Sequence, residues 1–117
     1  MNEQGKQTEK LALSWLKKQK LSLIQSNYSC RFGEIDLVML DALQLVFIEV
    51  RLRTNSRFGS AANSVNLKKQ QKIITTAKHF LMTNQQFSQH ICRFDVIAFE
   101  SSSAQSCPVW YKDAFRL

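Results

Sequence analysis

Two neighbouring stretches decide the fold: GEIDLVM at residues 33–39 and LVFIEVR at residues 45–51. Both are rich in apolar residues, with β-branched side chains among them, and both are short, which is typical of β-strands. The residues between them, DALQ at positions 41–44, suit a tight connection. We therefore predict that the two strands pair antiparallel as a hairpin.

Acidic residues interrupt both of these apolar strands. In the first strand, alternation predicts two faces: Glu34, Asp36 and Val38 on one, and Ile35, Leu37 and Met39 on the other. In the second strand, Glu49 falls on one face with Arg51. Asp36 and Glu49 are thus expected to approach each other on one face of the sheet. Two like charges at close range repel unless a proton or a cation lies between them, and carboxylate oxygens suit a hard cation such as Mg²⁺ or Mn²⁺.

The same pattern has a simpler interpretation. Acidic residues that alternate with apolar ones also mark a strand that has one face in water. Two features favour the paired acids over that interpretation. Both strands are otherwise apolar enough to be buried on both faces, and the basic residue Arg51 follows Glu49 by two positions.

Length and composition indicate one small folded domain. The chain has 117 residues, of which 44% are hydrophobic, so residues 1–117 are expected to form a single domain with one modest core. Only 3 Gly and 1 Pro argue against a linker, a repeat array or a disordered chain. Sixteen Lys and Arg against nine Asp and Glu give a net charge of +7. That balance favours a polyanionic partner such as a nucleic acid, although a basic protein without such a partner remains an alternative.

The cysteine spacing and the hydropathy of the chain indicate in which cellular compartment the protein is expected. Cys30, Cys92 and Cys107 are widely spaced and contain no Cys-x-x-Cys pair, which argues against a disulfide framework and a zinc site. Buried, reduced thiols in the cytoplasm are the expected state. The polar N-terminus does not resemble a signal peptide, and no apolar run approaches the roughly 20 residues that a membrane helix needs.

The rest of the chain supplies the flanking elements. Helices are predicted at residues 4–20 and 66–82, and further strands at 21–31, 91–99 and 109–111, with Ala114-Phe115 as a docking tail. Loops are predicted at residues 53–63, 84–89 and 100–106. The order helix, three strands, helix, two strands predicts an α/β fold with a mixed central sheet of four to five strands and two flanking helices.

Three helical residues are candidates to join the acidic pair. Glu9 lies at the margin of the first helix's apolar arc, where it could reach the sheet or be a first-turn glutamate that the helix dipole favours. Lys69 and Gln70 lie on or beside the apolar stripe of the second helix, near its start. They could reach the acids, or they could cap the core while Lys69 extends into solvent. His79 and His90 are expected to be surface residues without partners.

The predicted loop at residues 53–63 is polar and follows directly on the second acidic strand. Its arginines, Arg53 and Arg57, would lie just beyond the acidic face. A loop of this kind can follow a phosphate backbone, so both arginines are candidate nucleic-acid contacts, together with Lys69.

These residues resemble a known family pattern over most of the chain: Gly5-x-x-x-Glu9-x-x-Ala12, Gly33-Glu34-Ile35-Asp36, Val46-Phe47-Ile48-Glu49-Val50-Arg51-x-Arg53, Lys69-Gln70 with Ala77, and more weakly Arg93-Phe94-Asp95-Val96 and Ala114-Phe115. The pattern is similar to the YraN-like family of small uncharacterised bacterial proteins. That family in turn resembles the Holliday-junction-resolvase branch of the PD-(D/E)XK, or restriction-endonuclease-like, superfamily. The resemblance implies a restriction-endonuclease-like core.

The resemblance also implies roles for individual residues. Asp36 and Glu49 match the acids that bind Mg²⁺ or Mn²⁺, the backbone carbonyl of Val50 matches a further metal ligand, and Glu9 matches the first-helix acid of the resolvase branch. Gln70, or Lys69 beside it, matches a supporting helix position. Proteins of the resolvase branch tend to act as dimers, so a homodimer is a further expectation.

Arg51 is where the sequence departs from the superfamily pattern, which has lysine there. Arginine keeps its charge, with a pKa above ~12, so it cannot act as a general base, but it can hold a phosphate. The expected function is metal-dependent, endonuclease-like hydrolysis of DNA, including branched or structured DNA. The alternatives are a non-catalytic nucleic-acid-binding module on the same fold and a basic protein that docks an acidic partner.

Overall fold

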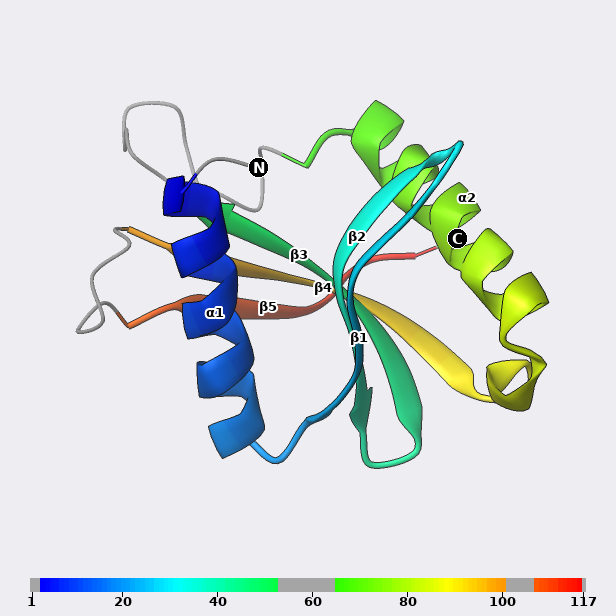
Figure 1. The fold of residues 1–117 in the computed structure, drawn as a ribbon, viewed down its shortest axis with the longest axis horizontal. Coiled ribbons are helices and arrows are strands. Elements are labelled where there is room, and N and C mark those ends of the chain that lie inside the picture. Colours follow the sequence, from blue (N-terminus) through cyan, green and yellow to red (C-terminus); the bar gives the residue numbers. More distant parts are fainter. Residues whose placement is uncertain (1–2, 53–64, 101–106, 117) are drawn as a thin grey trace.

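The computed structural model describes residues 3–52, 65–100 and 107–116 (Figure 1). The elements follow in this order: α1 (Glu3–Lys18), β1 (Ser22–Cys30), β2 (Gly33–Asp41), β3 (Gln44–Leu52), α2 (Leu67–Thr83), the 3₁₀ turn η3 (Gln85–Phe87), β4 (Ile91–Phe99) and β5 (Val109–Phe115). The predicted order of helices and strands is confirmed.

All five of these strands form one mixed sheet in the spatial order β1-β2-β3-β4-β5. The strands β3 and β4 pair in parallel, and the other neighbours pair antiparallel. The chain crosses from β3 to β4 through α2, because parallel strands need a long connection. Figure 1 shows α1 and α2 on opposite sides of the twisted sheet. The predicted α/β fold with a mixed sheet and two flanking helices is therefore confirmed.

Each helix covers its own apolar core. The core beneath α2 contains, among others, Tyr28, Ile35, Val38, Phe47, Ile73, Phe80 and Phe94. The core beneath α1 contains Ala12, Leu16, Leu37, Met39, Val46, Ile48, Ile97 and Phe99, among others. Since both faces of the central strands are covered, β3 is buried through most of its length. Within the described residues, neither helix is long and apolar enough to cross a membrane.

The alternation predicted for the first acidic strand is wrong at Ile35. Ile35 packs beneath α2, whereas Leu37 and Met39 pack beneath α1. The change of face occurs in the first part of β2, which pairs with β1 alone. The pairing of β2 with β3 begins only at Leu37. In the neighbouring strand β1, Asn27 lies between the partners of Leu37 and Ile35 and has a φ of +55°. A left-handed residue breaks the extended geometry on which strict alternation depends.

Several predicted boundaries shift by a few residues. The tail predicted at Ala114-Phe115 belongs to β5, where Phe115 stacks on Phe94 with ring centroids 5.1 Å apart. The predicted loop at residues 84–89 contains η3. The two-residue turn between β2 and β3 is tight, as predicted, and Ala42 adopts a φ of +55° in it.

Two expectations about single side chains are wrong. The Cys107 thiol is exposed rather than buried, while Cys30 and Cys92 are half-buried. His79 is half-buried, and its Nδ1 shares a hydrogen bond with the Tyr28 hydroxyl. The loop predicted at residues 53–63, with Arg53 and Arg57, lies outside the described residues.

Candidate active site

A small cavity lies where β3 approaches its C-terminal end. Its volume is about 140 Å³, and it is lined by Gly5, Thr8, Glu9, Asp36, Glu49, Val50 and Leu52. These residues come from the first turns of α1, from β2 and from β3. The structure thus brings Glu9 to the same cavity as Asp36 and Glu49, although Glu9 and Glu49 are about 40 residues apart in the sequence.

A backbone hydrogen bond fixes Asp36 in this cavity. The ladder between β2 and β3 stops at the pair Leu37–Ile48, one residue before Asp36 and Glu49 would face each other. Beyond that point the Val50 N–H donates to Asp36 Oδ2 at 2.7 Å. The carboxylate therefore satisfies a backbone donor that the sheet leaves unpaired.

Glu49 lies on the other side of the cavity and is 7% exposed. Its Oε1 is 3.2 Å from Lys69 Nζ and 3.6 Å from Arg51 Nε. Since Lys69 belongs to the first turns of α2, this ion pair joins β3 to the second helix. The Arg51 Nε is buried and has no hydrogen-bond partner among the described residues.

The electrostatics of the cavity leave Asp36 with a strong affinity for protons. Burial raises its pKa, and the charge of Glu49 raises it further, to about 7. The Val50 N–H lowers the pKa but does not outweigh those two effects, and Lys69 also lowers it. Asp36 and Glu49 therefore form a pair of buried carboxyl groups that favours a proton or a cation between them.

Glu9 faces the sheet rather than the solvent. Glu9 is only 8% exposed. Burial raises the pKa of Glu9, a hydrogen bond with the Asn27 side chain lowers it, and the charges of Glu34 and Glu49 raise it. Of the two interpretations of Glu9 from the sequence, the one in which the acid reaches the sheet is confirmed.

Lys69 and Gln70 differ in what they reach. Lys69 contacts Glu49, as one interpretation of the sequence predicts. The Gln70 Nε2 instead donates to the Val65 carbonyl oxygen at 2.9 Å, which fits the other interpretation, in which Gln70 caps the core near the start of α2. Asn66 fixes the same turn, because its Oδ1 accepts a hydrogen bond from the Lys69 N–H at 2.9 Å.

The donor set suits a cation that two carboxylates hold. In the described parts of the chain, no group of three Asp, Glu, His or Cys side chains is arranged to bind a metal ion. Mg²⁺, however, commonly binds through one or two carboxylates and keeps several waters. Asp36 and Glu49 offer oxygen ligands beside one cavity, and a cation there would relieve the repulsion that, in addition to burial, raises the pKa of Asp36. The residues present therefore fit such a group, and a role for the Val50 carbonyl remains a prediction.

The structure also contains a buried polar cluster that the sequence analysis missed. Asp95 is fully buried and accepts hydrogen bonds from Arg93 Nε and Nη2, Trp110 Nε1 and the Asp113 N–H, each at 2.9 Å. Arg93 also donates to Gln44 at 2.7 Å and to Asp41 at 2.9 Å. The signal in the sequence was two opposite charges, Arg93 and Asp95, on one face of an apolar strand.

This Arg93–Asp95 cluster has a structural role. Burial acts to lower the pKa of Arg93, but its hydrogen bonds and the charges of Asp95 and Asp41 outweigh that effect and raise the pKa. The cluster joins the turn between β2 and β3 to β4 and β5. Because the polar groups of the cluster use their hydrogen-bonding capacity on one another, they are poorly placed to bind a substrate.

Comparisons with known proteins identify relatives over nearly the whole chain. The model of the uncharacterised protein family UPF0102 matches residues 8–99. A UPF0102 protein from Psychromonas ingrahamii is 54% identical over 98% of this chain and 91% of its own length. One from Saccharophagus degradans is 47% identical over 99% of this chain and 95% of its own length. One from Pseudomonas syringae is 46% identical over 95% of this chain and 91% of its own length.

These relatives confirm the resemblance to a small, uncharacterised bacterial family. The matched segment runs from Thr8 to Phe99 and so contains all three acids of the cavity together with Lys69, Arg93 and Asp95. The chain belongs to the uncharacterised protein family UPF0102.

Proposed function

We propose that this protein hydrolyses phosphodiester bonds of DNA with a divalent metal ion, Mg²⁺ or Mn²⁺, held by Asp36 and Glu49. One observation carries the proposal. The carboxyl groups of Asp36 and Glu49 line one cavity, and Glu49 contacts two basic side chains. Burial and the charge of Glu49 together raise the pKa of Asp36 to about 7. Carboxylates with adjacent cations suit phosphoryl chemistry, in which a metal ion and basic groups share the negative charge of the substrate.

Each residue of the cavity has a part in the proposed reaction. When bound, the ion would polarise a phosphoryl oxygen and lower the pKa of the water that attacks phosphorus. Asp36 is already oriented by the Val50 N–H, so its free oxygen could ligate without a backbone change. Glu9, on the α1 side of the cavity, would hold a metal-bound water or accept its proton.

Arg51 and Lys69 would contact the phosphate of the substrate. Both now pair with Glu49 Oε1, the oxygen for which a cation would compete. Metal binding at Glu49 would release the two basic groups toward a bound phosphate. Arg51 would stabilise charge on the transferring group, and the ammonium of Lys69 would take over part of the role of the lysine that Arg51 replaces.

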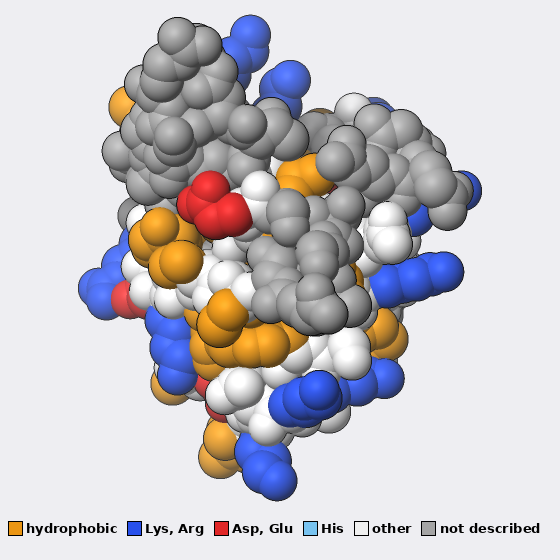
Figure 2. Space-filling view, turned by 90° about the vertical axis from the view of Figure 1, so that its left-hand side faces the viewer, with side chains coloured by type: hydrophobic (Ala, Val, Ile, Leu, Met, Phe, Trp, Pro, Cys, Tyr) orange, Lys and Arg blue, Asp and Glu red, His pale blue; other side chains and the backbone are white. Residues whose placement is uncertain are grey.

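The charge of the chain supports a nucleic acid as the partner. The net charge of +7 attracts a polyanion. Figure 2 shows lysine and arginine side chains at several margins of the face that it draws. Branched or otherwise structured DNA, contacts from Arg53 and Arg57, and a homodimer remain predictions; light scattering would test the last of these.

A second candidate function is nucleic-acid binding without cleavage. Arg51 at the place of a catalytic lysine favours it, because arginine cannot take a proton from water. The described residues also offer two adjacent carboxylates rather than a three-ligand group. A protein that docks an acidic partner through its basic surface is the remaining alternative.

The test is a cleavage screen with labelled single-stranded, duplex, flap and four-way-junction DNA, each with Mg²⁺, with Mn²⁺ and with a chelator. We expect metal-dependent cleavage of at least one substrate, and its loss in Glu49→Gln. Glu34→Gln is the matched control, because Glu34 lies on the same strand as Asp36 but is exposed. Metal-independent binding with no cleavage of any substrate would replace the proposal with the binding module.

A further inference from the structure

An aromatic ring lies at the tip of the hairpin that leads into the acidic strand. The turn between β1 and β2 consists of Arg31 and Phe32. Phe32 is 38% exposed, and the guanidinium of Arg31 lies 4.8 Å from the centroid of its ring. A single exposed aromatic side chain is ordinary on a protein surface, so its surroundings decide whether it has a role.

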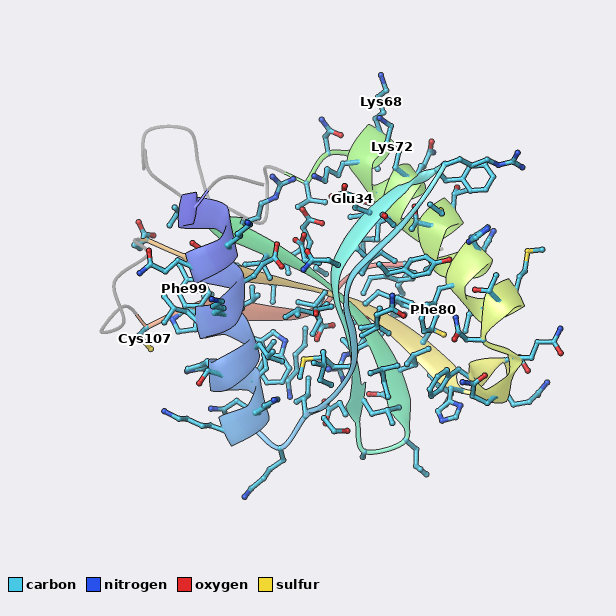
Figure 3. All side chains as sticks on the ribbon, in the orientation of Figure 1. Glu34, Lys68, Lys72, Phe80, Phe99 and Cys107 are labelled. Atoms are coloured by element: carbon cyan, nitrogen blue, oxygen red, sulfur yellow. The ribbon has the colours of Figure 1, made fainter. Side chains whose placement is uncertain are left out.

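Phe32 forms one wall of a shallow hollow whose other wall is α2. The hollow has a volume of about 220 Å³ and is lined by Phe32, Lys68, Gln71, Lys72 and Thr75. Two of these five side chains are cationic, and none is acidic. Figure 3 shows Lys68 and Lys72 extending from the N-terminal part of α2, at the same end of the molecule as Glu34.

A glycine sets the distance between the hairpin tip and α2. Gly33, next to Phe32, has a φ of +150°, and a Cβ there would lie only 3.1 Å from Thr76 Oγ1 and 3.9 Å from the Lys72 Cβ. The backbone thus approaches the helix more closely than another residue would allow. Phe32 is therefore held beside Lys72 by the packing of the chain, so the hollow is part of the fold.

The hollow and the basic partner of the acidic cavity share the first turns of α2. Lys69, which contacts Glu49, follows Lys68 directly and precedes Lys72 by one helical turn. Glu34 and Asp36 follow Phe32 along β2. A strand of DNA that places one phosphate at Glu49 and runs along the first turns of α2 would pass the hollow with a further nucleotide.

We propose that this hollow binds an unpaired nucleotide of the DNA held at the acidic site, with its base stacked on Phe32 and its flanking phosphates near Lys68 and Lys72. This inference rests on the proposed function and adds a substrate feature to it. Bases within a duplex stack on their neighbours through both faces, so only an unpaired base offers a free face to an aromatic ring. Gln71, which also lines the hollow, carries a donor and an acceptor for a base edge.

Binding to two DNA probes of equal length and charge tests the inference. One is a paired duplex, and the other carries a central unpaired segment with 2-aminopurine; both are titrated with a chelator present, so that no cleavage occurs. We expect the protein to prefer the unpaired probe and to quench its fluorescence. Phe32→Ala should weaken binding of that probe by about 5- to 150-fold, the range typical of one base–aromatic stack, and leave duplex binding unchanged.

Matched variants separate stacking from folding and charge. Phe32→Trp should retain the preference, because it keeps an aromatic face. Leu43→Ala is the control for loss of an exposed apolar side chain, since Leu43 is 83% exposed at the turn between β2 and β3. Lys68→Gln or Lys72→Gln should each reduce the slope of log affinity against log salt by about 0.7 to 0.9, whereas Lys17→Gln, at the far end of α1, should not.

Two results would overturn the inference in distinguishable ways. If the protein binds both probes equally and Phe32→Ala changes neither affinity, the hollow is not a nucleotide site, and the proposed function stands without it. If the unaltered protein binds neither probe at any salt concentration, the DNA-directed function fails together with the inference.

Discussion

Asp36 carries a carboxyl group whose pKa burial and the charge of Glu49 raise from the ordinary 3.8 to about 7. The folded protein therefore holds a proton that the unfolded chain releases near pH 4. From this group alone, the free energy of unfolding should be highest below pH 4 and should fall as the pH rises from about 4 through 7. Asp36→Asn removes this loss, because asparagine stays neutral and can still accept the Val50 N–H.

Urea denaturation at pH 5 and pH 8 measures this effect. We expect Asp36→Asn to gain stability relative to the unaltered protein as the pH rises between those values. Glu34→Gln, at an exposed position of the same strand, should show no such trend. A difference between Asp36→Asn and the unaltered protein that is the same at both pH values would show that Asp36 ionises as an ordinary surface acid.

Arg51 allows a test of catalysis at a single residue. Arg51→Lys places a compact ammonium with three donors beside Glu49, as the superfamily pattern has it. General acid–base assistance is typically worth about 10²- to 10⁴-fold, so even a fraction of it would raise Mg²⁺-dependent cleavage visibly. Cleavage that is strong in the unaltered protein and lost in Arg51→Lys would instead assign the arginine its own phosphate contact. No cleavage by either, with metal and DNA binding intact, would leave only the binding module.

At the scale of secondary-structure elements, we expect the Arg93–Asp95 cluster to stabilise the packing of β4 and β5 against the β2–β3 hairpin. Asp95→Ala would leave the guanidinium of Arg93 buried with fewer partners, and breaking a buried ion pair in this way typically costs about 3–5 kcal/mol. Urea denaturation should show that loss. The exposed pair of Asp113 and Arg116 is the control, because Arg116→Ala should change stability little. Equal effects of the two changes would contradict the structural role of the cluster.

The sequence was sufficient for the elements and for part of the site. The apolar runs and the short turn at residues 41–44 are local signals, so the order of elements and the approach of Asp36 and Glu49 to one another could be predicted. Glu9 could not be placed, because whether a helical acid faces the sheet depends on how α1 docks.

Other features needed the tertiary structure. Lys69 reaches Glu49 whereas Gln70 reaches the Val65 carbonyl. Helical periodicity gives their directions about 100° apart, but which of them reaches the acids depends on how α2 docks on the sheet. The change of face at Ile35 occurs beside the left-handed residue Asn27 of the neighbouring strand, a backbone conformation that the apolar pattern does not predict. The partners of Asp95 come from its own strand, β4, and from β5, and no local pattern reveals the contacts with β5.

For the whole molecule, the net charge of +7 makes a prediction about ionic strength. Log affinity for duplex DNA should fall linearly with log salt, by roughly 0.9 for each phosphate contacted. Arg57→Gln, in the loop predicted to follow the backbone, should lower that slope by about one without changing sequence preference. Filter binding or fluorescence anisotropy over a series of salt concentrations measures the slope. An affinity that is insensitive to salt would favour the alternative in which the protein docks an acidic partner.

The central claim is that Asp36 and Glu49 together bind a divalent cation, and calorimetric titration with Mn²⁺ tests it most directly. We expect binding at pH 8 that weakens as the pH falls through about 7, because a proton on Asp36 competes with the metal. Asp36→Asn and Glu49→Gln should each weaken binding strongly, and Glu34→Gln should not. Mn²⁺ binding that is unchanged in both Asp36→Asn and Glu49→Gln would contradict the claim.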